Sequence, residues 1–230
     1  MKKISNAVIL AGSTRGSIKK AGFPITTSGM TTILISAFIL VPALFMRCTA
    51  EDVAENSISK NAFVIYADRG DQRNHFAPSG WMGDYGDIRI DDSWSQNPAS
   101  GKTCVRIIYT AKGSQGANWA GLYWQNPPNN WGDRPGGYDL GSMKRLVFMA
   151  HGEKGGEKIA EFKIGGISGE HGDSDSASIG PVTLTQNWQK YTIDLAGKDL
   201  SHIVGGFAWS ASRDDNPNGF TIYLDDMRFE

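Results

Sequence analysis

Residues 118–132 read Asn-Trp-Ala-Gly-Leu-Tyr-Trp-Gln-Asn-Pro-Pro-Asn-Asn-Trp-Gly, and this stretch decides the fold. Apolar and aromatic residues alternate with a period of two until Pro127, which is the pattern of a β-strand that ends in a turn. One alternating set is predicted to face a hydrophobic core, namely Ala120, Leu122 and Trp124. The opposite face of the strand then carries Trp119, Gly121 and Tyr123.

This opposite face predicts a flat binding surface, because two aromatic rings flank a glycine. The loop that follows adds the amide Asn129 and the indole of Trp131. Sugars offer polarised C–H groups on a ring face and hydroxyls around its edge, which aromatic rings and planar amides complement. We therefore predict a carbohydrate-binding platform here; the alternative is that the rings pack inside the protein.

The rest of the chain beyond residue 62 repeats the strand pattern, with Gly, Asn, Asp and Pro between strands. The predicted strands are 63–67, 87–90, 103–111, 119–125, 144–152, 158–165, 182–184, 189–195, 205–210 and 220–229. No stretch beyond residue 60 keeps helical spacing for three turns. Many short strands with regular turn signals predict an all-β fold, a β-sandwich jelly roll, over residues 62–230.

The charge of the chain is unevenly distributed. Residues 1–50 hold six basic side chains and no acid, which leaves 17 basic and 24 acidic side chains after residue 50. A folded part with this negative balance has no electrostatic reason to bind nucleic acid or anionic lipid. All 7 Trp and all 7 Tyr also lie beyond residue 60, so we expect the folded domain there.

The N-terminal segment has the order of a secretory signal. A basic stretch precedes an apolar run at about residues 30–46, and Cys48 and Ala50 suit a cleavage site before Glu51. We predict a signal or membrane anchor over residues 1–50 and a polar spacer over 51–61, with export to the cell surface, the periplasm or the medium. Acylation of Cys48, as in a bacterial lipoprotein, stays open. Any contact with a membrane is expected through this segment alone.

The final strand breaks its own alternation. Leu224 and Met227 should both face inward, yet two residues separate them, which predicts a β-bulge at Asp225 and Asp226. Adjacent acids on a strand repel each other unless a positive group lies nearby, and a hard cation with oxygen ligands, such as calcium, would provide it. The alternative is that one acid points to solvent and the other pairs with Arg228 or a lysine.

An ordered set of segments resembles one known group of proteins. The segments are Val-Ile-Tyr-Ala-Asp (64–68), Ser-Gly-Lys-Thr-Cys-Val-Arg-Ile (100–107), Trp-Ala-Gly-Leu-Tyr-Trp (119–124), Asp-Leu (139–140) with Leu-Val-Phe (146–148), Thr-Gln-Asn-Trp-Gln-Lys-Tyr-Thr-Ile-Asp-Leu (185–195) and Ile-Tyr-Leu-Asp-Asp-Met (222–227). Together they resemble the galactose-binding-like β-jelly-roll carbohydrate-binding modules of bacterial glycoside hydrolases. The resemblance implies glycan binding on a concave sheet face or in rim loops. It also implies a structural calcium ion at Asp68 and Asp225, with Asp226 as a further ligand.

Further residues are candidates for the glycan site. Trp119 and Tyr123 are the predicted stacking rings. Trp131 and Trp81 lie in Gly- and Pro-rich loops, where a large exposed ring indicates a binding role. Arg106 and His151 occupy outward positions on neighbouring predicted strands and are expected on the same face. Three other tryptophans are predicted to pack in the core or at sheet ends, namely Trp124, Trp188 and Trp209.

Signatures of catalysis are missing from the sequence. It contains no Gly-x-Ser-x-Gly and no His-Glu-x-x-His motif, and no predicted strand carries carboxylates on alternate residues as jelly-roll glycosidases do. A lyase would need a base beside a charge neutraliser, and Tyr123, His151 and Arg106 are the candidates for that role. The leading hypothesis is a monomeric, non-catalytic polysaccharide-binding protein. The alternatives are a polysaccharide lyase or hydrolase, and an adhesion module that binds protein.

Overall fold

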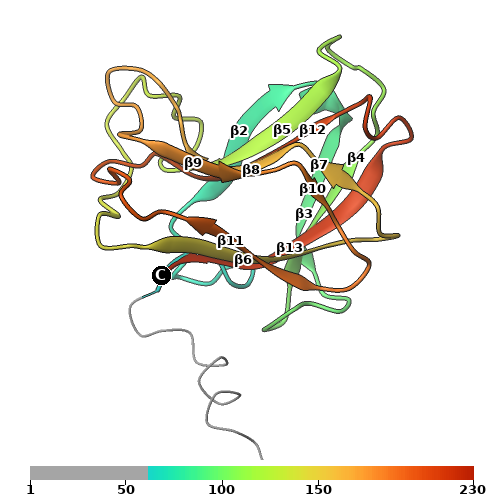
Figure 1. The fold of residues 1–230 in the computed structure, drawn as a ribbon, viewed down its shortest axis with the longest axis horizontal. Coiled ribbons are helices and arrows are strands. Elements are labelled where there is room, and N and C mark those ends of the chain that lie inside the picture. Colours follow the sequence, from blue (N-terminus) through green and yellow to red (C-terminus); the bar gives the residue numbers. More distant parts are fainter. Residues whose placement is uncertain (1–61) are drawn as a thin grey trace, which may run out of the picture. The chain divides into compact units, whose positions relative to one another are not determined.

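The computed structural model describes residues 62–230; the predicted signal segment and spacer (1–61) lie outside the described residues. Figure 1 shows two facing β-sheets in this part of the chain, so the predicted all-β sandwich is confirmed. Every strand pair within it is antiparallel. No helix among residues 62–230 is long and apolar enough to cross a membrane.

The first sheet has the order β11-β6-β13-β4-β3, and β1 pairs with the C-terminal residues 227–229 of β13. Its strands are β1 (Phe63–Tyr66), β3 (Ile88–Trp94), β4 (Cys104–Tyr109), β6 (Arg145–Gly152), β11 (Gln189–Asp194) and β13 (Phe220–Phe229). The second sheet has the order β2-β5-β12-β8-β9. Its strands are β2 (Ala77–Gly83), β5 (Trp119–Gln125), β8 (Glu161–Gly165), β9 (Ser176–Ile179) and β12 (Gly205–Ser212). A short pair, β7 (Lys158–Ile159) with β10 (Val182–Thr183), and a single 3-10 turn, η1 (Tyr85–Asp87), complete the elements.

The core lies between the two sheets and is rich in aromatic rings. The inward set of β5 behaves as its alternation predicts, since Ala120, Leu122 and Trp124 are at most 1% exposed. Phe148 of the first sheet packs against Phe162 of the second, with ring centroids 4.8 Å apart. Burial of such rings is the main stabilising contribution in this fold.

The predicted β-bulge in β13 is present. The register of β13 against β6 shifts between Asp225 and Arg228, and Asp226 has a φ of 52°. The extra residue allows Leu224 and Met227 to be fully buried on either side of the two acids.

Two strands of the second sheet were not predicted, β2 and β9. β2 contains Pro78, Gly80 and Gly83, which the sequence analysis read as a loop. Both strands lie at the edges of the sheet, where a proline that cannot donate to a neighbour is tolerated.

Candidate functional site

The outward face of β5 forms the centre of the candidate site. Trp119 is 40% exposed at the start of the strand, and Gly121 follows on the same face. Tyr123 is next in the alternation, but it is only 5% exposed. Of the two rings of the predicted platform, that of Trp119 is therefore exposed and that of Tyr123 is largely buried.

Neighbouring strands extend the face around Gly121. Met82 of β2 lies opposite Gly121 on one side, and Ser210 of β12 lies opposite it on the other. Glu161 of β8 is the next partner beyond Ser210. These side chains surround a hollow of about 200 Å³, which is lined by Met82, Trp119, Tyr123, Glu161, Lys163, Ala208, Trp209 and Ser210.

Gly121 is required at the floor of this hollow. A Cβ atom at this position would lie 2.7 Å from the carbonyl oxygen of Trp209 and 2.8 Å from Cε of Met82. The missing side chain therefore lets Met82 lie across the strand beside Trp119. An indole, a thioether chain and a few polar groups at one place match the composition of ligand sites in general.

The polar groups of the hollow come from β8 and β12. Lys163 Nζ and Glu161 Oε2 are 4.0 Å apart, a loose pair between partly exposed side chains. Their donors and acceptors, together with the hydroxyl of Ser210, point to the same side as Trp119. This contribution could not be predicted from the sequence, because only strand pairing places β12 beside β5 and β8 beside β12.

Tyr123 lines the hollow but is largely buried, and its predicted stacking role stays a prediction. Its hydroxyl donates to the carbonyl of Gly165 at 2.9 Å, and burial raises the pKa of this phenol well above its usual value. The ring of Trp131 stands edge-on to it with centroids 6.0 Å apart. Trp131 is 42% exposed, so it supplies the accessible ring at this end of the face.

The loop of Trp131 is held by its own polar groups. The buried Asn130 accepts the N–H of Gly132 and donates to the carbonyl of Arg134. Gly132 has a φ of 84°, and its carbonyl accepts the N–H of His171 from the loop after β8. Asn129 is exposed beside Trp131, and its backbone N–H donates to Ser79 Oγ.

Trp81 lies on strand β2 rather than in a loop, and it does not join the platform. It pairs in register with Leu122, whereas Met82 pairs with Gly121. Alternation therefore directs Trp81 to the side of Leu122, away from Trp119. Trp81 is 38% exposed because β2 is an edge strand.

The predicted positions of Arg106 and His151 are also wrong. Arg106 is on β4 and His151 is on β6, and both strands belong to the first sheet. They lie on either side of Tyr223 on that sheet, while Tyr123 belongs to the second. The three side chains considered for a lyase are therefore not brought together.

Two of the acids predicted to hold calcium, Asp68 and Asp225, accept hydrogen bonds from backbone amides. Asp225 Oδ2 accepts the N–H groups of Ala99 and Ser100, and its Oδ1 accepts that of Asp226. Asp68 Oδ1 accepts two backbone N–H groups from Lys102 and Thr103. These hydrogen bonds occupy some of the lone pairs that a cation would use, so the calcium site stays a prediction. Among residues 62–230, no three acidic, histidine or cysteine side chains gather to hold a metal.

Asp226 follows the alternative that the sequence left open. Its carboxylate pairs with Arg228 at 2.9 Å, which neutralises the charge at the bulge.

Of the other tryptophans, Trp124 and Trp209 are 1% exposed, as predicted for core residues. Trp188 packs edge-on against His151 at the end of the first sheet.

Comparisons with known proteins give similarities in structure alone. No protein-family model matches the chain, and the comparison with curated proteins finds no match. The structure is similar to a family 30 carbohydrate-binding module of a cellulosomal cellulase of Clostridium thermocellum, with a TM-score of 0.49, 18% identity and coverage of 74% of this chain and 96% of that one.

Two further solved structures are similar to a lesser degree. One is the family 11 carbohydrate-binding module from Clostridium thermocellum in complex with a β-1,3-1,4-mixed-linked tetrasaccharide, with a TM-score of 0.43, 13% identity and coverage of 71% and 93%. The other is a variant of a family 29 carbohydrate-binding module, with a TM-score of 0.43, 12% identity and coverage of 73% and 90%.

Proposed function

We propose that this chain is an exported, non-catalytic polysaccharide-binding protein, on a sandwich of the galactose-binding-like jelly-roll type. The glycan lies on the outward face of the second sheet, across Trp119 and the hollow beside it. The order of basic and apolar residues in 1–50 supports export, and the net negative charge beyond residue 50 suits a neutral ligand better than a polyanion.

The observation that carries this proposal is the exposed ring of Trp119 at the edge of a polar hollow. Exposing an indole to water costs free energy, and here no core side chain covers 40% of it. Met82 and Gly121 make the adjacent surface flat and apolar, while Glu161, Lys163 and Ser210 provide hydrogen-bonding groups. A sugar ring stacked on the indole would reach these groups with its hydroxyls.

The geometry favours binding over hydrolysis. A glycosidase needs two carboxyl groups about 5–10 Å apart on either side of the bond that it cleaves. The hollow is lined by one carboxylate, Glu161, which lies close to Lys163. This arrangement can hold a sugar by hydrogen bonds, but it does not provide an acid with a second carboxylate.

In an adhesion module that binds protein, we would expect Trp119 and Tyr123 to be buried and the outward face of β5 to be filled by side chains. Tyr123 meets this expectation, but Trp119 and Trp131 do not, and the hollow beside Trp119 is open. The exposed pair of indoles therefore supports a small, ring-shaped ligand over a broad protein surface.

Affinity electrophoresis of the purified full-length chain tests the proposal. Native gels would contain β-glucan, xylan, mannan or β-galactan, and wild type would run beside Trp119→Ala. We expect at least one polymer to retard the wild type, to retard Trp119→Ala far less, and to keep its length during incubation. Equal retardation of both proteins, no retardation by any polymer, or shortening of the retained polymer would contradict the proposal.

A further inference from the structure

The first sheet carries a second aromatic cluster on its own outward face. Tyr223 of β13 lies between His151 of β6 and Arg106 of β4. The imidazole of His151 stacks on the Tyr223 ring with centroids 4.5 Å apart and an interplanar angle of 10°. Trp94 lies on the other side of Tyr223, with a centroid distance of 6.3 Å.

The rings of this cluster are held in fixed orientations. The guanidinium carbon of Arg106 is 3.7 Å from the ring centroid of Trp94, and Arg106 pairs with Asp91 at 3.3 Å. The indole N–H of Trp188 donates to the carbonyl of Asn97, which ties the segment after β3 to the start of β11. Such contacts set the positions of the rings before any ligand arrives, which lowers the entropic cost of binding.

Hydrogen-bonding side chains surround the same place. A hollow of about 250 Å³ is lined by the rings of Trp94, His151 and Tyr223 together with Gln96, Asn97, Glu153 and Gln186. The hydroxyl of Tyr223 lies 3.4 Å from Glu153 Oε1, and the amide of Gln186 donates to the carbonyl of Glu153. Rings beside amides and a carboxylate are again the groups that a saccharide satisfies.

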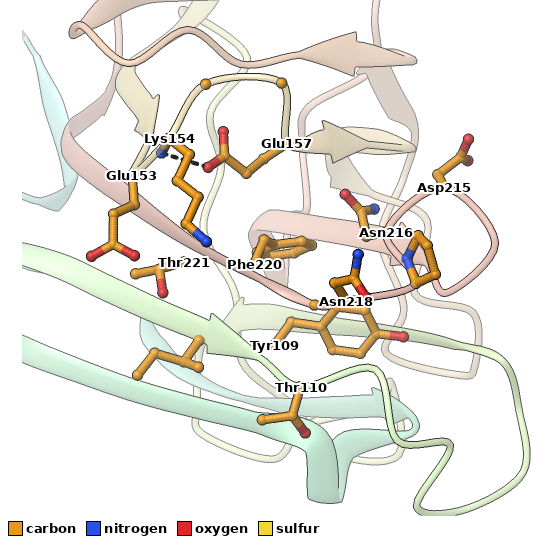
Figure 2. A pocket seen from close by; sticks show the side chains of 15 residues that line it. Tyr109, Thr110, Glu153, Lys154, Glu157, Asp215, Asn216, Asn218, Phe220 and Thr221 are labelled. Carbon is orange, nitrogen blue, oxygen red and sulfur yellow. Dashed lines mark hydrogen bonds between the residues drawn. The ribbon is translucent and has the colours of Figure 1, made fainter.

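A larger hollow lies next to this one. Glu153 also lines a hollow of about 520 Å³, and so does Thr221, which lies two residues before Tyr223 and on the same face of β13. Figure 2 shows Glu153 and Lys154 on one side of it and Asp215, Asn216 and Asn218 of the β12–β13 loop on the other. The two hollows therefore lie next to each other at Glu153, and we refer to the pair, from Trp94 to Asn218, as the trough.

We propose that this trough is a second carbohydrate site, on the opposite sheet of the sandwich from Trp119. It rests on the proposed function in that the ligand class is the same, a neutral polysaccharide chain. Trp94 provides the ring surface, with the largely buried Tyr223 packed beside it, and Glu153, Gln96 and Asn97 hydrogen-bond the hydroxyls. With one site on each sheet, a single molecule joins two glycan chains and gains avidity on a polymeric surface.

Isothermal titration of the full-length protein tests the second site. The probes are the linear hexasaccharides of β-glucan, xylan, mannan and β-galactan, and the variants are Trp94→Ala, Trp119→Ala and the double variant. We expect two ligands per wild-type molecule for at least one probe, one ligand for each single variant, and none for the double variant. Trp94→Phe keeps a ring and should keep the second ligand at a weaker affinity.

Glu153→Gln provides a readout if Trp94→Ala fails to fold. Its side chain is exposed, and we expect it to weaken the second binding event at least threefold while leaving the first unchanged. One ligand per wild-type molecule, lost in Trp119→Ala and unaffected by Trp94→Ala and Glu153→Gln, would overturn the second site and leave the proposed function standing. One ligand that is lost in Trp94→Ala and kept in Trp119→Ala would instead support the trough and overturn the proposed site. Failure of all probes to bind would overturn both.

Discussion

Trp131 stands edge-on to the ring of Tyr123, with centroids 6.0 Å apart and an interplanar angle of 83°. The two residues differ in exposure, since Tyr123 is 5% exposed and Trp131 is 42% exposed. Tyr123 joins the strand to the loop, and Trp131 presents a ring to solvent. Substitutions at Tyr123 should therefore act on the fold first and on ligand binding second.

Tyr123→Phe keeps the ring and removes the hydroxyl that donates to Gly165. We expect the free energy of unfolding to fall by about 1 kcal/mol, because the carbonyl of Gly165 loses a buried donor. Glycan affinity should change less than twofold. Denaturant unfolding and affinity electrophoresis check both, and a tenfold loss of affinity in Tyr123→Phe would instead show that the hydroxyl contacts the ligand.

Tyr123→Ala removes the support under Trp131. A buried aromatic residue replaced by alanine costs about 3–5 kcal/mol. We expect a lower melting temperature and a weaker retention on glycan gels, the latter because Trp131 loses the ring that it packs against. Retention equal to wild type, in a variant shown to be folded, would contradict the supporting role.

His202 joins the loop of Trp131 to the loop after β8. Its Nδ1 lies 2.7 Å from the carbonyl of Gly172, and its Nε2 lies 2.7 Å from the carbonyl of Gly136. The imidazole therefore bridges the two loops through one carbonyl group of each.

His202→Ala removes the imidazole that bridges these two carbonyl groups. We expect the free energy of unfolding to fall by about 1–3 kcal/mol, and glycan affinity to fall because Trp131 is less well positioned. His171→Ala is the matched control, since its contact to Gly132 uses the backbone N–H that alanine retains. Equal effects of the two substitutions on affinity would argue against a positioning role for His202.

Asp225 makes stability depend on pH. Desolvation by burial raises the pKa of its carboxyl from 3.8 to about 7, although the N–H groups of Ser100, Asp226 and Ala99 oppose this. The folded protein therefore holds this proton over a pH range in which the unfolded chain has released it. The contribution of Asp225 is fully present below about pH 4 and is lost as the pH rises to about 7, at no more than about 1.4 kcal/mol per pH unit.

Asp225→Asn removes the titrating group. We expect the free energy of unfolding of the variant to decrease less than that of wild type between about pH 4 and pH 7. Urea unfolding of both proteins at several pH values provides the comparison. Parallel pH profiles would show that Asp225 titrates alike in the folded and unfolded states.

Calcium should have little effect on this protein. Both oxygens of Asp225 and Oδ1 of Asp68 accept backbone N–H groups, and a cation would compete with those hydrogen bonds. We expect the melting temperature to be the same with EDTA and with millimolar Ca²⁺. A rise of several degrees with Ca²⁺ that disappears in Asp225→Asn would contradict this expectation.

Local alternation was sufficient to predict much of the fold. The faces of β5 and the bulge at Asp225 follow from the alternation of side chains along a single strand, and this alternation can be read from the sequence. The edge strand β2 was missed because Pro78 and its glycines are typical of loops, and only its position at the sheet edge makes them acceptable.

The composition of the candidate site was harder to predict, because it depends on which strands pair. Arg106 lies close to Trp119 in the sequence, yet β4 and β5 belong to different sheets. Met82, Glu161 and Ser210 reach Trp119 only through the pairing of β2, β12 and β8. Alternation also gave the direction of Tyr123 correctly but not its burial, since the covering loop with Trp131 folds back over it.

The central claim is that the outward face of β5 holds the sugar, and a matched pair of tryptophan substitutions tests it most directly. Trp119 and Trp81 are 40% and 38% exposed on paired strands of one sheet, but their alternation places them on opposite sides. We would use isothermal titration to measure the dissociation constant for the polysaccharide that retards the wild type, with Trp119→Ala and Trp81→Ala as the variants. A loss of about tenfold or more, about 1.4 kcal/mol, is predicted for Trp119→Ala and less than twofold for Trp81→Ala. An equal loss in both, or a loss in Trp81→Ala alone, would contradict the account.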